Sequence, residues 1–438
     1  MSAVGALVPS LLAVMVVLAI GLPATGLTTY FCMYVLDQWA SASLPFFAQR
    51  PWLINTVVAL IVFLSVFCAW MKEKNLRLIG GAVHVSVIAF LLYAAISITW
   101  SPVPKAAMQS WINAGPKLLI GVLFVPILIT STKDLYRALN IFVVVALMIL
   151  SGIMLFADWS YRSFTLPEGT GEEVRLPLAL AVFCGLAFLT SLLMTPHKGL
   201  SRMFLLARIV VAVLAVVVCF RTGSRGQLLA MIAALMIFLP LSLGYKHGRG
   251  LFAGILLVPI GILVIYLIAF ANPDLFFVGH DSHRWSVEKL NLEEGDRLAM
   301  SLRLLDVWMH HPSAIFIGLG NSASFDPNIL GIYPHNVYVE VLAEEGFAGL
   351  IAFSLIIFMV IKRFFSLYAD PTLGVQEQKM LALFGALLTY EMLLCLKQGS
   401  MIGHANLWMY IIIIERLYLL VREKDTVPVL NNAVMAIK

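Results

Sequence analysis

Residues 251–271 read LFAGILLVPIGILVIYLIAFA and contain no charged side chain. An α-helix of this length extends about 30 Å, which matches the hydrocarbon core of a bilayer. The run is apolar on every face instead of alternating between apolar and polar residues, so it predicts a membrane-spanning helix and not a strand of a β-barrel. Similar runs recur along the whole chain.

The composition agrees with this interpretation. Hydrophobic residues make up 61% of the chain and charged residues only 12%, whereas soluble domains carry about 25% charged residues. We therefore expect an all-α polytopic membrane protein with about 12 transmembrane helices. The predicted spans are 5–36 (kinked near Pro23), 52–71, 79–99, 114–131, 136–157, 176–194, 203–220, 225–243, 250–271, 335–361, 378–396 and 403–421.

The distribution of basic residues predicts the orientation. With these spans, one set of short loops carries most of the 29 Lys and Arg residues, so these loops and both termini should be cytoplasmic. The helices then occupy 1–271 and 335–424, a large periplasmic loop occupies 272–334, and 425–438 form a cytoplasmic tail. Within the loop, apolar residues at helical spacing from about 294 to 310 predict an amphipathic helix.

Several functions find no support in the sequence. The five cysteines lie in or beside apolar runs and form no CxxC pair, so we interpret them as packing residues. The net charge of +5 comes without a basic stripe interleaved with aromatic residues, which argues against nucleic-acid binding. The chain contains no HExxH motif and no Walker A loop, so we expect neither a metal nor another cofactor.

Arginines gather at predicted outer helix ends. Arg175 lies where the sixth span begins, and Arg221 and Arg225 flank the turn Thr222-Gly223-Ser224. Free N–H groups at the start of the next helix, with two guanidinium groups beside them, would bind an anion at the depth of lipid phosphates. The alternative is that these arginines anchor helix ends at the interface. Arg284, Arg297 and Arg303 lie in the large loop.

A second polar cluster begins at Pro334-His335-Asn336, where the tenth span opens. We expect His335 in the first helical turn, where the helix dipole favours a neutral imidazole able to act as a general base. Asn336, Glu340 and Glu344 follow on one helix face, which should line a cavity or meet arginines. The alternative is that His335 only ends a helix and the acids form a solvated rim.

These residues together resemble a known family. The resemblance rests on Ser224-Arg225-Gly226, on Arg303 with Trp308 and His311-Pro312, and on Gly318-Leu319-Gly320-Asn321, His335-Asn336-Val337-Tyr338 and Glu344-Glu345-Gly346. This order is similar to the O-antigen ligase superfamily, also called Wzy-C, and Trp100-Ser101 resembles its N-terminal half. The specific part covers residues 221–350.

The resemblance implies a GT-C-like fold and a lipopolysaccharide O-antigen ligase of the bacterial inner membrane. Such an enzyme moves a glycan from undecaprenyl diphosphate to the lipid A–core oligosaccharide at the periplasmic face, with no metal or nucleotide. By resemblance, His335 would deprotonate the acceptor hydroxyl, and Arg225 and Arg303, joined by Arg221 and Arg175, would hold the diphosphate. Asn336, Tyr338 and Glu344 would support them.

Two alternatives stay open. An O-antigen polymerase of the same superfamily would use a growing lipid-linked glycan as the acceptor. A lipid or glycolipid transporter would also have about a dozen spans and acids within them, such as Glu391. Transporters carry such charges near the midplane and show similar halves, whereas the charges here gather at one face and no internal repeat is visible.

Overall fold

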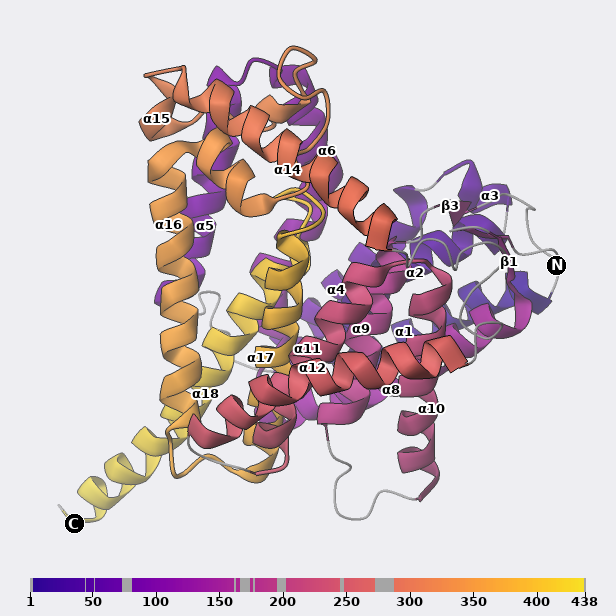
Figure 1. Ribbon diagram of the computed structural model, residues 1–438. Helices are drawn as coiled ribbons and strands as arrows, with labels where there is room; N and C mark the ends of the chain where they lie inside the picture. The colour runs from indigo at the N-terminus through magenta and orange to yellow at the C-terminus, as the bar shows by residue number, and fades with distance from the viewer. Residues whose placement is uncertain are drawn as a thin grey trace. The chain divides into compact units, whose positions relative to one another are not determined.

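The computed structural model describes residues 3–43, 45–50, 52–72, 81–160, 163–165, 174–175, 178–194, 202–244, 248–271 and 287–436. Helices dominate this part of the chain (Figure 1). The elements are α1 (Ala3–Gly21), α2 (Thr25–Ser43), α3 (Pro45–Ala48), α4 (Trp52–Lys72), α5 (Ala82–Ile96), the 3-10 turn η1 (Ser97–Trp100), α6 (Pro104–Leu119), the π-helical turn η2 (Ile120–Phe124), α7 (Val125–Leu128), α8 (Thr132–Phe156), β1 (Asp158–Ser160), β2 (Ser163–Thr165), β3 (Val174–Arg175), α9 (Leu178–Leu193), α10 (Arg202–Arg221), α11 (Arg225–Ser242), α12 (Gly248–Ala271), α14 (Val287–Met309), α15 (Ala314–Ile317), the 3-10 turn η4 (Ala323–Phe325), α16 (Val337–Tyr368), α17 (Val375–Cys395) and α18 (Ala405–Ala436).

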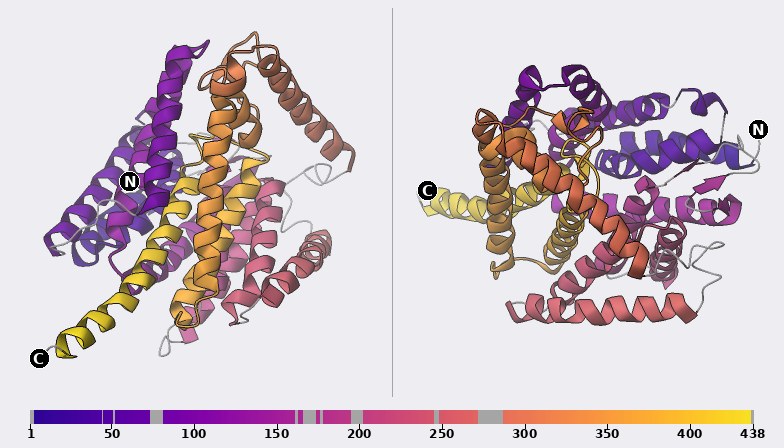
Figure 2. Two further views of the ribbon diagram at one scale, coloured as in Figure 1. Left: turned by 90° about the vertical axis from the view of Figure 1, so that its left-hand side faces the viewer. Right: turned by 45° about the horizontal axis from the view of Figure 1, so that its top comes forward.

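The chain divides into two compact units. Unit 1 consists of Met1–Leu76 and Lys133–Glu293, and unit 2 consists of Arg77–Thr132 and Glu294–Lys438. In unit 1, α2 packs against α1, α4 and α9, and α11 packs against α9 and α12. In unit 2, α16 packs against α5, α17 and α18, and the contact of α16 with α18 is visible in the left view of Figure 2.

Eight helices of the described residues are long and apolar enough to cross a membrane. They are Trp52–Lys72, Ala82–Trp100, Pro104–Leu128, Thr132–Phe156, Arg202–Arg221, Arg225–Ser242, Val337–Tyr368 and Val375–Cys395. Shorter apolar stretches occur at Val8–Gly21, Leu178–Leu193 and Phe252–Ile268. The protein is therefore a helical, multi-pass membrane protein.

Two features differ from the expectations. The predicted first span, 5–36, is two helices, because the chain turns between Gly21 and Thr25. Proline has no N–H to continue the ladder at Pro23, and both the N–H and the hydroxyl of Thr25 donate to the Leu22 carbonyl, at 2.9 and 2.8 Å. The second difference is a small three-stranded antiparallel sheet, β1-β2-β3, which the sequence did not predict in this otherwise helical chain.

Helix α16 breaks at Gly346, whose φ of +68° and ψ of −170° are not helical. The break leaves the carbonyls of Ala343 and Glu344 without their helical donors. They accept hydrogen bonds from the N–H groups of Leu319 and Gly320, both at 2.9 Å. The segment after α15 is therefore attached to the first turns of α16 by backbone bonds.

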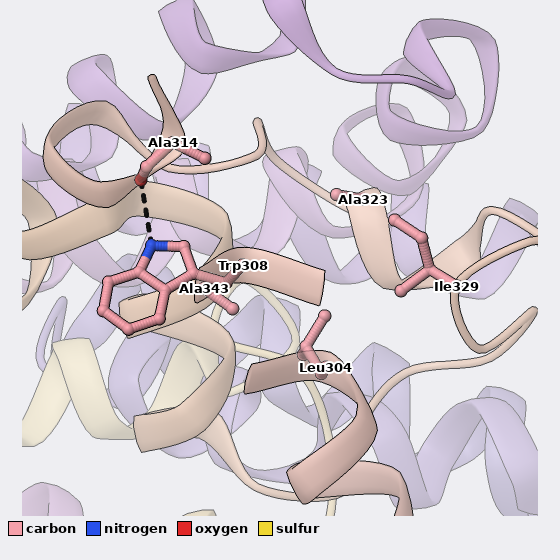
Figure 3. Packing of buried hydrophobic residues seen from close by; sticks show 6 residues of the cluster. All are labelled: Leu304, Trp308, Ala314, Ala323, Ile329 and Ala343. Carbon is pink, nitrogen blue, oxygen red and sulfur yellow. Dashed lines mark hydrogen bonds between the residues drawn. The ribbon is translucent and has the colours of Figure 1, made fainter. Parts of the chain in front are cut away.

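A buried apolar cluster packs beneath this segment (Figure 3). Leu304 and Trp308 of α14 belong to it, and the Trp308 indole N–H donates to the Ala314 carbonyl at 2.9 Å. Ala323, Ile329 and Ala343 complete it. The helix predicted at 294–310 is therefore present as part of α14, and its apolar face packs within unit 2.

Candidate active site

His335 precedes α16 instead of lying in its first turn as expected. Asn336 is the N-cap, and its side-chain oxygen accepts hydrogen bonds from the N–H groups of Tyr338 and Val339, at 3.1 and 3.3 Å. His335 has a φ of +59°, in the left-handed region. Side chains with a β-carbon adopt this conformation at a cost, and such residues concentrate at functional sites.

The surroundings of His335 favour the neutral form of its ring. Its centroid lies 4.2 Å from that of the Tyr333 ring. Partial burial lowers the pKa of His335 below its usual value, and the positive charge of Arg297 lowers it further. A neutral imidazole has a lone pair that can accept a proton from a hydroxyl group. The cause is burial and a neighbouring cation, whereas the sequence suggested the helix dipole.

The acids of the predicted polar stripe are buried, and they accept backbone hydrogen bonds instead of meeting arginines. The Glu344 carboxylate accepts from the N–H groups of Ser322 and Ser324, at 2.6 and 3.0 Å. The Glu340 carboxylate accepts from the N–H of Met401 at 3.0 Å. Each buried carboxylate therefore holds a loop against α16. The hydrogen bonds satisfy both the carboxylate oxygens and the backbone N–H groups of the loop.

A neighbouring network joins segments far apart in the chain. Glu345 Oε1 accepts from the Ser97 hydroxyl and from the Asn321 amide, both at 3.1 Å. The indole N–H of Trp111 donates to the Asn321 side-chain oxygen at 3.1 Å. Gly320 lies so close to the Ser101 backbone that a side chain would collide with it. The Trp100-Ser101 and Gly318–Asn321 motifs therefore meet in unit 2.

Tyr338 ties the first turn of α16 to α17, because its hydroxyl donates to the Met392 carbonyl at 3.1 Å. With Asn336 as the cap and Glu344 on the loop, all three residues predicted to support His335 fix the start of α16. Residues 210–354, which contain His335, Asn336, Tyr338 and Glu344, match the family described as O-antigen ligase, Wzy_C.

This segment of the chain is similar to the O-antigen ligase family. The family comprises O-antigen ligases and polymerases, which are enzymes of the glycosyltransferase type that act on glycan and lipid substrates. No curated protein matches the chain.

The O-antigen ligase segment also contains the turn Arg221–Arg225, which belongs to unit 1. Arg221 lies over the Trp159 ring of β1, with 6.0 Å between the guanidinium carbon and the ring centroid. Arg225 opens α11 and is only 4% exposed. Gly223, in the turn between them, has a positive φ of +66°. Ser224 occupies the N-cap position of α11, but its side chain makes no capping bond there.

The remaining predicted arginines have different surroundings. Arg175 lies in β3, where it pairs with Ser163 of β2 in the sheet that also contains Trp159. Arg303 is exposed on α14 and donates to the Asn328 carbonyl at 3.2 Å. Arg284 lies outside the described residues. Unit 2 thus contains His335, its three supporting residues and Arg303, whereas Arg175, Arg221 and Arg225 belong to unit 1.

Sequence reasoning missed some of these contacts. It gave Arg297 no role, although its charge acts on His335. Glu391, which had no assigned place, pairs with His404 at 3.1 Å, and the other ring nitrogen of His404 lies 2.7 Å from the Gln398 carbonyl. Only the fold reveals such pairs. Within the described residues, no three His, Cys, Asp or Glu side chains are arranged to hold a metal ion.

Proposed function

We propose that this protein is a lipopolysaccharide O-antigen ligase of the bacterial inner membrane. It would transfer a glycan from undecaprenyl diphosphate to a hydroxyl of the lipid A–core oligosaccharide at the periplasmic face. The observation that carries this proposal is the position of His335, half-buried and in a left-handed backbone conformation directly before the Asn336 cap of α16. The family match makes glycan and lipid the relevant substrates.

In the proposed mechanism, His335 takes the proton of the acceptor hydroxyl as the oxygen attacks the anomeric carbon. The bond from that carbon to the diphosphate oxygen breaks on the opposite face, so the configuration inverts. The electron pair leaves on undecaprenyl diphosphate. Arg225 and Arg303, with Arg221 and Arg175, would bind the diphosphate and stabilise its growing negative charge. The energy comes from the donor, so the reaction needs no nucleotide.

The test uses protein in lipid nanodiscs, an undecaprenyl-diphosphate-linked glycan and lipid A–core, with EDTA and without nucleotide. His335→Ala should lower the transfer rate by about 10²- to 10⁴-fold, the usual contribution of a general base. Arg225→Ala should lower it by about 10²-fold or more. His310→Ala is the matched control, because His310 is exposed and its ring bonds within its own helix turn.

Each outcome of this assay supports a different function for the protein. Core lipid carrying glycan in the parent, but not in His335→Ala, supports the ligase. A longer lipid-linked glycan with no transfer to the core identifies a polymerase. Equal transfer by the parent and His335→Ala removes His335 from the chemistry. Movement of intact glycolipid between leaflets, without a new glycosidic bond, would instead identify a transporter.

A further inference from the structure

A pocket of about 600 Å³ opens on unit 2. Its wall comes from the end of η1, the last turn of α14, α15 and the segment that follows α15. Among the described residues, His335, Arg297 and Arg303 do not contribute to the wall. Arg297 and the wall residue Val307 are ten positions apart on α14, which corresponds to about 15 Å along the helix.

The wall combines one aromatic ring, several aliphatic side chains and a few polar groups. Trp100 supplies the ring, and Val307, Ile317 and Ile329 supply aliphatic surface. His311 and Asp326 supply polar atoms. An apolar wall with a few placed polar groups is typical of small-molecule sites. A pyranose matches it, because one sugar face presents C–H groups to an aromatic ring while the hydroxyls point outward.

The hydrogen bonds that His311 and Asp326 already make show which of their atoms can accept a hydrogen bond from a ligand. His311 Nδ1 lies 2.7 Å from the Val307 carbonyl, which can only accept, so Nδ1 carries the proton. In the neutral ring, Nε2 is then an acceptor. Asp326 Oδ1 accepts from the N–H and the amide of Asn328, at 2.8 and 3.0 Å, and these bonds do not use Oδ2. Both groups therefore offer acceptors to sugar hydroxyls.

The same groups disfavour other occupants. An anionic headgroup or an acidic sugar would meet the Asp326 carboxylate, which repels it. An acyl chain would leave both acceptors desolvated without donors. A neutral sugar avoids both costs, since it supplies hydroxyl donors and carries no charge.

The pocket is preformed by rigid contacts. The Trp308 indole fixes the first residue of α15, and the Asp326 carbonyl accepts N–H bonds from Ile329, Leu330 and Gly331 at 2.9 to 3.1 Å. A pocket held in this way binds without a large ordering cost.

We propose that this pocket is a subsite for a neutral pyranose of the glycan. The inference rests on the proposed function, because that function supplies the glycan. Arg303, one of the arginines proposed to hold the diphosphate, donates to the carbonyl of the wall residue Asn328 at 3.2 Å, so the subsite lies next to that arginine.

The test measures binding by saturation-transfer NMR on protein in nanodiscs. The probe is the glycan released by mild acid from the undecaprenyl-diphosphate pool of the host cells. Trp100→Ala should lower the signal on the order of tenfold, as expected for loss of an aromatic contact in a small site. Ser313→Trp, which fills the pocket from an exposed wall position, should do the same. Trp52→Ala, at a tryptophan that is 61% exposed in unit 1, is the matched control and should leave the signal unchanged.

A glycan signal unchanged in Ser313→Trp, with the parent's thermal midpoint, would overturn the proposal. So would saturation of the pocket by short-chain phosphatidylglycerol without any glycan signal, which would identify a lipid site. The transfer assay separates this inference from the proposed function. Ser313→Trp should raise KM for the glycan donor. If the parent binds glycan but does not transfer it, the subsite proposal stands and the ligase proposal is rejected. If Ser313→Trp transfers glycan as the parent does, only the subsite proposal is rejected.

Discussion

At the scale of single residues, Arg297 and His335 are coupled through charge. Burial and the Arg297 guanidinium both lower the pKa of His335, so the ring stays neutral at pH values where an ordinary histidine is protonated. A general base works only when neutral, and its activity is lost as the pH falls through its pKa. Arg297 therefore extends activity toward acidic pH.

Arg297→Gln should move the acidic limb of the pH profile of kcat/KM to higher pH. Removing the cation raises the pKa of His335, so protonation begins sooner as the pH falls. Arg303→Gln provides the comparison, because it removes an exposed arginine from the same helix. It should lower kcat/KM through weaker donor binding and leave the limb in place. Identical limbs in the parent and Arg297→Gln would contradict the coupling.

The left-handed backbone of His335 predicts an order of stability among its variants. At a φ of +59°, a β-carbon costs about 1 kcal/mol and glycine escapes that cost. His335→Gly should therefore unfold at a higher thermal midpoint than His335→Ala, although both lack transfer activity. Equal or reversed midpoints would mean that the conformation is not strained.

At the scale of elements, the break in α16 organises unit 2. Gly346 has a positive φ, and a β-carbon there would collide with the backbone of Phe316 and Gly318. The carbonyls released by the break hold the segment 318–320 that carries Asn321 toward Glu345. Disturbing one glycine should thus displace the loop that supports the start of the helix.

Gly346→Ala should lower the thermal midpoint and transfer activity together. Gly295→Ala is the control, because Gly295 lies within α14, has nothing near its missing side chain and is helical. That substitution should be neutral or stabilise by up to about 1 kcal/mol. If Gly346→Ala unfolds at the parent's midpoint, the break does not depend on glycine.

At the scale of the whole molecule, α16 makes the predicted orientation testable. The stretch from Phe347 to Tyr368 is about 33 Å long, enough to cross the hydrocarbon core. The segment before α16 and the end of α16 must then face opposite compartments. The distribution of Lys and Arg assigns the earlier segment to the periplasm.

Single cysteines provide the measurement. In a Cys68→Ser background, which leaves the four buried native cysteines, Asn328→Cys should react with an impermeant maleimide added outside spheroplasts. Lys362→Cys, an exposed position near the other end of α16, should react only after the membrane is opened. The reverse pattern would invert the topology and place His335 in the cytoplasm.

The sequence by itself determined the features that depend on neighbouring residues. Apolar runs predicted membrane helices because each spanning helix must satisfy its own backbone hydrogen bonds. Gly223 in its turn and the helix in the loop, α14, followed from local conformational preferences. The clusters of arginine and histidine could be recognised in the sequence because these residues gather at the ends of the predicted helices.

Only the tertiary structure decided the features that depend on distant partners. Ser97 and Glu345 are far apart in the chain and meet because α5 packs against α16. The conformation of His335, the effect of Arg297 on it and the partners of Glu344 arise in the same way. The sequence contains the donors and acceptors, but burial removes water as their alternative partner, and packing selects which of them pair.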